Sequence, residues 1–305
     1  MPDMWDCIIV GAGPAGLSAA VYMGRFKRRT LVLDAGDGRW SYGQRNENYL
    51  GFPNGVSARR LHRLGRAQAE RFGVKVRDEA VRAVAQEGEC FRLETQSASE
   101  LARTLIWAAG VRDHWPGFPG ARSLVGKHLF WCIVCDGWRT RERSVLIMGN
   151  DDHSAGTALQ FLTYTRDLTF LVDPAEDCLS AGARAKLEAD GMRMVSGTIA
   201  RVERSGHDLG RVRLRDGTTL GPELLFSLLG SSPRTELLAA LPLELASNGH
   251  IWIDDKNHTS LPNFFAAGDV TNKHSHQVVS AAHEGAMAAQ AANHVLYPSY
   301  QRLES

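Results

Sequence analysis

The sequence contains one Cys-x-x-Cys, in the segment FWCIVCDG at residues 130–137. Two sulfurs separated by two residues close a disulfide at little loop-entropy cost and reopen it to a dithiol, so Cys132 and Cys135 form a candidate redox pair. If Cys135 begins a helix, the free amides of that helix favour its thiolate over its thiol. The spacing and the residue types therefore predict thiol–disulfide chemistry.

Two other interpretations of the pair are weaker. A structural zinc site needs four ligands, yet the chain has no second Cys-x-x-Cys, and His114 and His128 make a poor completing set. A buried, inert pair is the second alternative. We assign no metal ligand. The other cysteines, Cys7, Cys90 and Cys178, are isolated and are predicted to be small buried hydrophobic side chains.

A nucleotide-binding turn is predicted near the N-terminus. A short apolar strand at residues 7–10 runs into GAGPAG at residues 11–16, and a helix-like run follows at residues 17–23. In this pattern the glycines allow a tight turn, the approach of a pyrophosphate to the backbone, and close packing of helix on strand. The helix N-terminus then favours the diphosphate. The predicted contact residues are Gly11, Gly13, Pro14, Ala15 and Gly16.

An acidic residue completes this first site. The apolar strand at residues 30–33 ends at Asp34, a carboxylate placed to accept a hydrogen bond from a ribose hydroxyl. Strand, turn, helix and acid together predict a bound dinucleotide.

Two later segments indicate which dinucleotide is bound. LIWAAG at residues 105–110 and NFFAAGDV at residues 263–270 are apolar strands that run into a glycine. Both resemble signature elements of flavoproteins with two dinucleotide-binding domains, in which the second segment brings its Asp to the ribityl chain and phosphates of FAD. The resemblance implies FAD, with Gly110, Gly268 and Asp269 at its site. The run at residues 277–296 is rich in Ala and Gly, as in a helix packed on a cofactor, although an ordinary amphipathic C-terminal helix is the alternative.

The chain as a whole resembles the low-molecular-weight thioredoxin reductases. The resemblance covers nearly the full length and rests on the glycine-rich turn, Asn46-Glu47-Asn48 with Gly51, Gly110, the redox segment, Gly268-Asp269 and His276-Gln277. It implies that Asn48, His276 and Gln277 join the FAD contacts. It also implies that Cys135 faces the flavin, that Cys132 attacks the substrate disulfide, and that Asp136 shuttles the proton.

The same resemblance implies the architecture. We expect an α/β fold of two Rossmann-like three-layer domains, the second inserted into the first. The FAD-binding domain would comprise residues 1–114 and 243–305, and the inserted redox domain residues 115–242, with crossings near 117–120 and 241–248. The implied partner is a thioredoxin-like protein or a small dithiol or disulfide, and the implied oligomer is a homodimer.

The inserted domain carries a second candidate turn, SVLIMGNDDHSAGTA at residues 144–158. It places Asp151 and Asp152 where a pyrophosphate needs bare backbone, and each carboxylate would also cap the helix N-terminus. The next strand, at residues 168–172, ends at Asp173, where NADPH-using relatives place arginines. We therefore do not expect NADPH to be used, although Asp173 as an NADH-type ribose acceptor stays open.

Loss of the pyridine-nucleotide site does not imply loss of the redox chemistry. The chain resembles an NADPH-independent branch in which some members take electrons from ferredoxin, some are dithiol oxidases that use oxygen, and one type carries a second flavin. Trp131 and Trp138 flank the pair and could stack such a flavin, or they could pack at a domain interface. Arg139, Arg141 and Arg143 could dock an acidic donor such as ferredoxin. Outside the enzyme class, the alternative is a non-catalytic flavin redox sensor.

The bulk composition agrees with a two-domain globular protein. The chain has 305 residues, of which 44% are hydrophobic and 23% charged, so two domains can each bury a core. A formal net charge of +1 offers no global field for nucleic acid or an anionic membrane. No apolar run reaches membrane-spanning length, and acidic residues precede the first apolar stretch, so no signal peptide is expected. The expected compartment is the cytoplasm.

Overall fold

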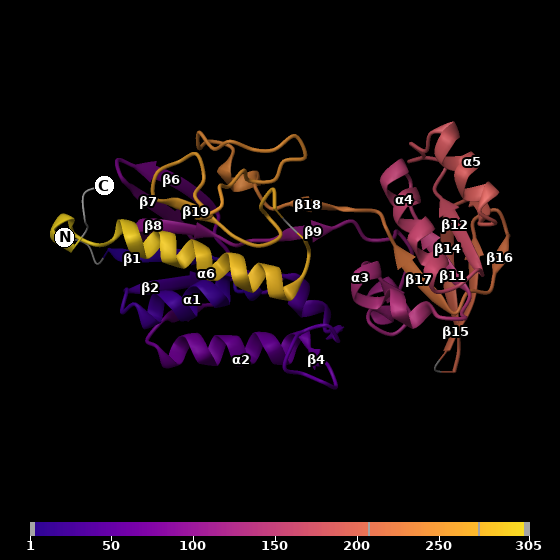
Figure 1. The fold of residues 1–305 in the computed structure, drawn as a ribbon, viewed down its shortest axis with the longest axis horizontal. Helices are drawn as coiled ribbons and strands as arrows, with labels where there is room; N and C mark the ends of the chain where they lie inside the picture. Colours follow the sequence, from indigo (N-terminus) through magenta and orange to yellow (C-terminus); the bar gives the residue numbers. More distant parts are fainter. Residues whose placement is uncertain (1–3, 207, 274, 302–305) are drawn as a thin grey trace. The chain divides into compact units, whose positions relative to one another are not determined.

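The computed structural model describes residues 4–206, 208–273 and 275–301. The chain divides into two compact units. The first comprises the chain up to Gly43, Tyr49–Arg112 and the chain from Ser232 onward. The second comprises Gln44–Asn48 and Asp113–Ser231. Figure 1 shows the helices and strands of both units.

A seven-stranded sheet forms the centre of the first unit, in the order β5-β2-β1-β8-β7-β6, with β19 also paired to β8. The strands are β1 Trp5–Val10, β2 Thr30–Leu33, β5 Lys75–Arg77, β6 Ala83–Glu87, β7 Cys90–Glu94, β8 Ser99–Trp107 and β19 Phe264–Ala266. β5, β2, β1, β8 and β19 are parallel, and β6 and β7 add an antiparallel meander to β8. Because parallel strands end at the same edge, the turns after β1, β2 and β19 lie along one edge of the sheet.

The remaining elements of the first unit are mostly helical. They include α1 Pro14–Arg25, α2 Ala58–Arg71, α6 Val278–Val295, the 3-10 helices η1 Arg39–Tyr42, η5 Glu236–Leu238 and η6 Ser299–Gln301, and the strand β4 Val56–Ser57. α1 and α6 lie side by side along the sheet (Figure 1). An added Cβ at Gly285 of α6 would lie 2.0 Å from the carbonyl oxygen of Ala15. The small residues of α6 therefore serve its close approach to α1.

The second unit repeats this plan with a five-stranded parallel sheet, in the order β10-β17-β11-β12-β13. An antiparallel sheet β14-β15-β16 follows β13 in the chain. The strands are β10 Leu129–Phe130, β11 Val145–Met148, β12 Leu168–Val172, β13 Arg193–Ser196, β14 Ile199–Ser205, β15 Asp208–Leu214, β16 Thr219–Leu220 and β17 Leu224–Ser227. The helices and shorter elements are α3 Ile133–Asp136, η3 Gly137–Thr140, α4 Asp152–Gln160, α5 Ala181–Ala189 and the strand β3 Arg45–Asn46.

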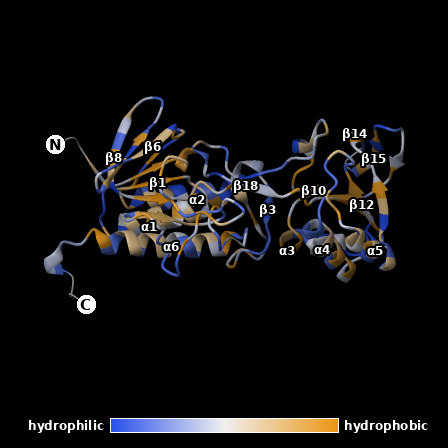
Figure 2. Cartoon of the chain, turned by 90° about the horizontal axis from the view of Figure 1, so that it is seen from above, coloured by the Kyte–Doolittle hydropathy of each residue, from blue (hydrophilic) through white to orange (hydrophobic). Residues whose placement is uncertain are grey.

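The central strands read as continuous apolar runs because both faces of each sheet are covered. Every residue of β2, β11 and β17 is buried. Figure 2 shows the central strands β1 and β12 as largely hydrophobic. The predicted fold class, α/β with Rossmann-like sheets, is confirmed, and the predicted strands at residues 7–10, 30–33 and 168–172 all form.

The domain boundaries differ from the expected ones. The chain crosses between units at Arg112/Asp113 and Ser231/Ser232, not near residues 117–120 and 241–248. The crossings are the paired strands β9 Val111–Asp113 and β18 Ser231–Pro233. Residues 232–242 belong to the first unit because Trp107 Nε1 donates a hydrogen bond to the Arg234 carbonyl at 2.8 Å and Leu238 is buried in the same core as Trp107.

Gln44–Asn48 also departs from the expected division, because it belongs to the second unit. Among the described residues, none of the helices is long and apolar enough to cross a membrane.

The α1–α6 contact generates a stability prediction. Gly285→Ala should lower the free energy of unfolding of the first unit by about 1–3 kcal/mol, since the added methyl group overlaps backbone that cannot move aside. Urea unfolding followed by tryptophan fluorescence measures the change in midpoint.

The control is another helical glycine. At Gly156 in α4 an added Cβ meets no heavy atom within 4 Å, so Gly156→Ala should raise stability by about 0.4–1 kcal/mol. A Gly285→Ala protein as stable as the wild type would contradict the close helix contact.

Candidate functional site

The redox pair stands at the start of a helix. Cys132 and Cys135 form a disulfide with their Cα atoms 5.3 Å apart. Cys132 is the N-cap of α3, and its sulfur accepts the amide N–H of Cys135 at 3.1 Å. Cys135 is the third residue of α3 rather than its first. The amide that we expected to stabilise a thiolate at Cys135 therefore points at the sulfur of Cys132.

Asp136 follows the pair and lies against an arginine. Its side chain is 15% exposed, and Arg139 Nε donates to its Oδ1 at 2.7 Å. Burial raises the pKa of Asp136, while the hydrogen bond and charge of Arg139 act in the opposite direction. A carboxyl group with a raised pKa keeps its proton to higher pH, as a proton donor to a leaving thiolate requires.

Arg139 has a second carboxylate partner that the sequence did not indicate. Its Nη2 donates to Glu47 Oε1 at 3.2 Å, although the two residues are far apart in the chain. Glu47 and Asn48 lie in the short stretch that belongs to the second unit, together with the redox pair. Asn48, predicted as an FAD contact, is thus in a different unit from the glycine-rich turn.

The first nucleotide turn has the geometry that its glycines predicted. Gly11 has a φ of +100°, and an added Cβ there would lie 2.4 Å from the carbonyl oxygen of Ala108. At Gly16 an added Cβ would lie 1.8 Å from the carbonyl oxygen of Gly11. Gly13 is the N-cap of α1, with Pro14 at the first helical position and no side-chain cap. The first amides of α1 are therefore available to an anion.

Asp34 lies near the half-buried ring of His62, on which Trp40 stacks, and the sequence did not indicate this pair of rings. Asp34 Oδ1 accepts the amide N–H of Ala12 at 3.0 Å, and His62 Nε2 is 4.0 Å from Asp34 Oδ2, too far for a direct hydrogen bond. Trp40 stacks on His62 with ring centroids 3.7 Å apart. The nitrogens Trp40 Nε1 and His62 Nε2 are buried and have no hydrogen-bond partner among the described residues. Burial lowers the pKa of His62 more than Asp34 raises it, so the ring is neutral at pH 7.

The C-terminal residues of the predicted site also lie in the first unit. Gly268 follows β19 with a φ of +82°, and its amide donates to the buried Glu284 carboxylate at 2.8 Å. Asp269 forms an ion pair with Arg39 at 2.8 Å. Three further predicted positions complete the set: Gly110 with a φ of +68°, His276 with a φ of +53°, and Gln277 as the N-cap of α6.

The second turn is closed by its own side chains. Asp151 is the N-cap of α4: its carboxylate accepts the amide N–H of Ser154 at 2.8 Å, and its own amide donates to Ser154 Oγ at 3.1 Å. Asp152 does not cap α4; its carboxylate accepts the amide N–H of Ser180 at 2.8 Å. Asp173 accepts hydrogen bonds from the amide of Ala175 and the hydroxyl of Thr198 at 3.1 and 2.9 Å. Each carboxylate thus has a structural partner.

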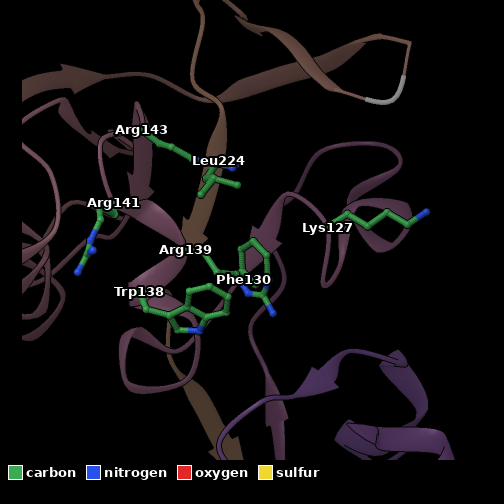
Figure 3. A pocket seen from close by; sticks show the side chains of 7 residues that line it. All are labelled: Lys127, Phe130, Trp138, Arg139, Arg141, Arg143 and Leu224. Carbon is green, nitrogen blue, oxygen red and sulfur yellow. The ribbon is translucent and has the colours of Figure 1, made fainter. Parts of the chain in front are cut away.

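A basic pocket of about 570 Å³ lies in the second unit. It is lined by Lys127, Phe130, Trp138, Arg139, Arg141, Arg143 and Leu224. Figure 3 shows Arg139 next to the rings of Phe130 and Trp138, and its guanidinium carbon is 4.6 Å from the centroid of the Trp138 ring. Lys127, Arg141 and Arg143 form no ion pair within the described part of the chain.

The other cysteines only partly match expectation. Cys7 is buried, as predicted, and burial raises the pKa of its thiol to about 12. Cys90 is half-buried and Cys178 is exposed, so the prediction was wrong for Cys178, which lies in the surface loop between β12 and α5. The described residues contain no group of three or more metal-ligating side chains.

Comparison with known proteins identifies the family. The family model of the pyridine nucleotide-disulphide oxidoreductases matches residues 5–288. The chain belongs to this family. The thioredoxin reductase of Treponema pallidum (strain Nichols) is 32% identical over 302 residues, which cover 96% of this chain and 97% of that protein.

Further relatives agree. The thioredoxin reductase of Mycolicibacterium smegmatis is 31% identical and covers 93% of this chain and 94% of its own. The crystal structure of the thioredoxin reductase from Streptococcus pyogenes MGAS5005 superposes with a TM-score of 0.88 at 26% identity, covering 97% of this chain and 99% of that one. The chain is thus a thioredoxin reductase-like, flavin-dependent disulfide oxidoreductase.

The family implies FAD, and the first unit of this thioredoxin reductase-like protein fits it. The α1 amides are uncapped, and Gly13 leaves open space where a Cβ would stand. The unpartnered Nε2 of His62 lies 4.0 Å from the carboxylate of Asp34, so a hydroxyl group there would satisfy a buried polar atom.

This fit generates a binding prediction. The purified protein should carry non-covalent FAD in near-stoichiometric amount. Gly13→Ala should weaken FAD binding by roughly tenfold or more, or about 1.4 kcal/mol, because the added methyl group occupies the space that a diphosphate needs. Visible flavin absorbance and FAD released on denaturation measure the binding.

The control is Gly117→Ala, which also places a methyl group in open space, in the second unit, and should leave FAD binding unchanged. Thermal unfolding of both apoproteins separates lost affinity from lost folding. Wild-type FAD affinity in Gly13→Ala would contradict the placement of the diphosphate at this turn.

Proposed function

We propose that this protein is an FAD-dependent thiol–disulfide oxidoreductase of the thioredoxin reductase type, in which electrons pass between flavin and the Cys132–Cys135 pair without NADPH. The observation that carries the proposal is the contrast between the two nucleotide turns. α1 begins without a side-chain cap, whereas α4 begins with a reciprocal cap between Asp151 and Ser154.

The closed turn supports independence from NADPH through electrostatics. The Asp151 carboxylate already accepts a hydrogen bond from the amide of Ser154, which a pyrophosphate would otherwise use. The carboxylate is also negatively charged, like that ligand, and therefore repels it. Two unit charges about 4 Å apart interact by about 4 kcal/mol at an effective dielectric of about 20. A loss of about 4 kcal/mol lowers affinity roughly a thousandfold, enough to turn a micromolar site into a millimolar one.

FAD would be held in the first unit. We assign the diphosphate to the turn and the start of α1, a ribose to Asp34, and the ribityl chain to Asp269. The proposed contacts are Gly11, Gly13, Pro14, Ala15, Gly16, Asp34, Asn48, Gly110, Gly268, Asp269, His276 and Gln277. Bound flavin supplies a centre that accepts electrons singly or in pairs, so a one-electron donor such as ferredoxin can serve it.

The residues of the redox segment take separate roles. Cys132 attacks the substrate disulfide, since its sulfur receives the amide N–H that favours a thiolate. Cys135 faces the flavin, and Asp136 carries the proton. Relatives are named thioredoxin reductases, and we infer a thioredoxin-like protein or a small dithiol or disulfide as the partner.

The basic pocket supports an acidic electron donor. Lys127, Arg141 and Arg143 carry charge that no carboxylate of the described residues neutralises, and such a patch steers an acidic protein such as ferredoxin. A second flavin on Trp138, beside Trp131, is the competing use of this region. We infer a homodimer from the resemblance, and we propose the cytoplasm as the compartment because five cysteines are too few for a secreted disulfide scaffold.

Three rival functions remain testable: a dithiol oxidase that passes electrons to oxygen, an NADH-dependent reductase with Asp173 on the ribose, and a flavin redox sensor. Both carboxylate oxygens of Asp173 already accept hydrogen bonds, so the NADH-dependent reductase receives the least support of the three.

The proposed electron supply is tested by four reductants in anaerobic stopped-flow experiments. Micromolar NADPH should fail to bleach the flavin and NADH should do little better, because the second turn is closed, while reduced ferredoxin should bleach it. Bleaching by dithionite is the control for a reducible flavin. Bleaching by a dithiol alone, with oxygen consumed in air, would favour the oxidase. Rapid bleaching by micromolar NADPH would overturn the proposal.

The roles of the two cysteines are tested by substitution. Cys132→Ser should leave a Cys135 thiolate next to the flavin and give a long-wavelength charge-transfer band in the visible spectrum, whereas Cys135→Ser should not. Cys90→Ser serves as the matched control and should retain one reducible disulfide per chain. If the band appears in Cys135→Ser instead, the two roles are inverted.

A further inference from the structure

We propose that the Glu47–Arg139 pair sets the protonation of Asp136 and thereby the pH range in which the redox pair reduces a disulfide. Arg139 and Glu47 are positioning residues in this scheme, acting through Asp136. The inference rests on the proposed function, since it requires Cys132 and Cys135 to turn over.

The geometry places one guanidinium between two carboxylates. Arg139 reaches Asp136 Oδ1 through Nε at 2.7 Å and Glu47 Oε1 through Nη2 at 3.2 Å. Glu47 in turn has Arg45 Nε within 3.3 Å. The side chains of Asp136, Arg139 and Glu47 are 15%, 25% and 26% exposed, so solvent screens their interactions only partly.

Aromatic rings hold the guanidinium in this position. Its carbon lies 4.6 Å from the ring centroid of Trp138 and 5.6 Å from that of Phe130. Cation–π contacts of this kind favour a fixed, partly dehydrated guanidinium. Arg139 therefore has little freedom to leave one carboxylate for the other.

Three influences on Asp136 compete. Burial raises its pKa, the hydrogen bond and charge of Arg139 lower it, and the charge of Glu47 raises it. Among the described residues, Arg139 and Glu47 are the charged groups that shift the pKa of Asp136. Arg45 forms an ion pair with Glu47. Because Arg139 is shared, Glu47 draws away part of the charge that would otherwise hold Asp136 ionised.

The chemistry links this balance to rate. In the reduced protein the Cys132 thiolate attacks one sulfur of a substrate disulfide; the new S–S bond forms as the substrate bond breaks, and the leaving thiolate takes the proton of Asp136. The Cys135 thiolate then attacks Cys132, closing the protein disulfide and releasing the second substrate sulfur as a thiolate that water protonates. Two electrons pass from the protein dithiol to the substrate. The rate therefore falls as Asp136 loses its proton with rising pH.

The test uses two substitutions that should act in opposite directions. All proteins carry Cys178→Ser, which removes the exposed thiol. Each full-length protein is first reduced and then reacts once with hydroxyethyl disulfide at a series of pH values. The thiols that remain are counted after acid quenching. Arg139→Gln removes the charge that favours ionised Asp136, so the fall in rate at alkaline pH should move to higher pH. The expected shift is roughly one pH unit, the lower end of the pKa shifts that an adjacent opposite charge produces. Glu47→Gln should move the fall in rate to lower pH by a smaller amount.

Three controls separate tuning from structural damage. Arg139→Lys retains the charge and should return the alkaline fall toward the wild-type pH. Arg166→Gln and Glu188→Gln remove exposed charges of the same unit that form no ion pair within the described part of the chain, and should not move it. With an aromatic disulfide such as dithiobis(nitrobenzoate), the leaving thiolate needs no proton, so the differences between variants should vanish.

The outcomes are distinguishable. If wild-type protein gains two thiols on reduction and exchanges, but Arg139→Gln and Glu47→Gln shift the profile in the same direction or not at all, the inference is wrong while the proposed function stands. If the wild type gains no reducible pair, the function fails and the inference fails with it.

Discussion

Backbone amides in the first turn of a helix need acceptors, and three helices of this protein meet that need in three ways. At α1 the N-cap is Gly13, which offers no side chain, so the amides are left to a ligand. At α3 the sulfur of Cys132 accepts the amide of Cys135. At α4 the carboxylate of Asp151 and the hydroxyl of Ser154 satisfy each other's backbone. The group that accepts these amide hydrogen bonds, whether a ligand, a sulfur or a carboxylate, therefore differs among the three helices.

The closed turn at α4 shows how a unit with a nucleotide-binding fold satisfies the start of a helix with its own side chains. An added Cβ at Gly149 would lie 2.6 Å from the side chain of Ser154, so this glycine serves contact between strand and helix. Asp152 holds the start of α5 through Ser180, and Asp173 holds Thr198. These acidic residues thus stabilise the loops at this edge of the sheet.

Next to the redox pair, burial and a neighbouring charge act in opposite directions on the pKa of Asp136. A buried carboxyl group tends to keep its proton, and a neighbouring guanidinium tends to remove it. Asp136 experiences both, and Glu47 moderates the second by sharing Arg139. The protonation of Asp136 therefore depends on residues other than the two cysteines. Glu47 lies in the same unit as Asp136 and Arg139, and its ion pair with Arg139 joins Gln44–Asn48 to the redox segment.

Local sequence determined the parts of this protein that depend on neighbours in the chain. The apolar runs predicted the central strands, GAGPAG predicted the turn before α1, and Asp151 predicted a capped α4. Two sulfurs three residues apart predicted the disulfide, because its closure is also local. The family and the fold class followed from the order of these motifs.

Tertiary structure alone decided what depends on residues distant in the chain. Arg139 meets Glu47 across 92 residues, and Arg39 meets Asp269 across 230. The crossings lie at the pair β9–β18, and the hydrogen bond from Trp107 to the Arg234 carbonyl holds the chain after β18 on the first unit. Composition and periodicity report only which face of an element is buried, and they carry no information on which two buried faces meet. The stacking of Trp40 on His62 beside Asp34 arises from three elements, β2, η1 and α2, brought together by folding.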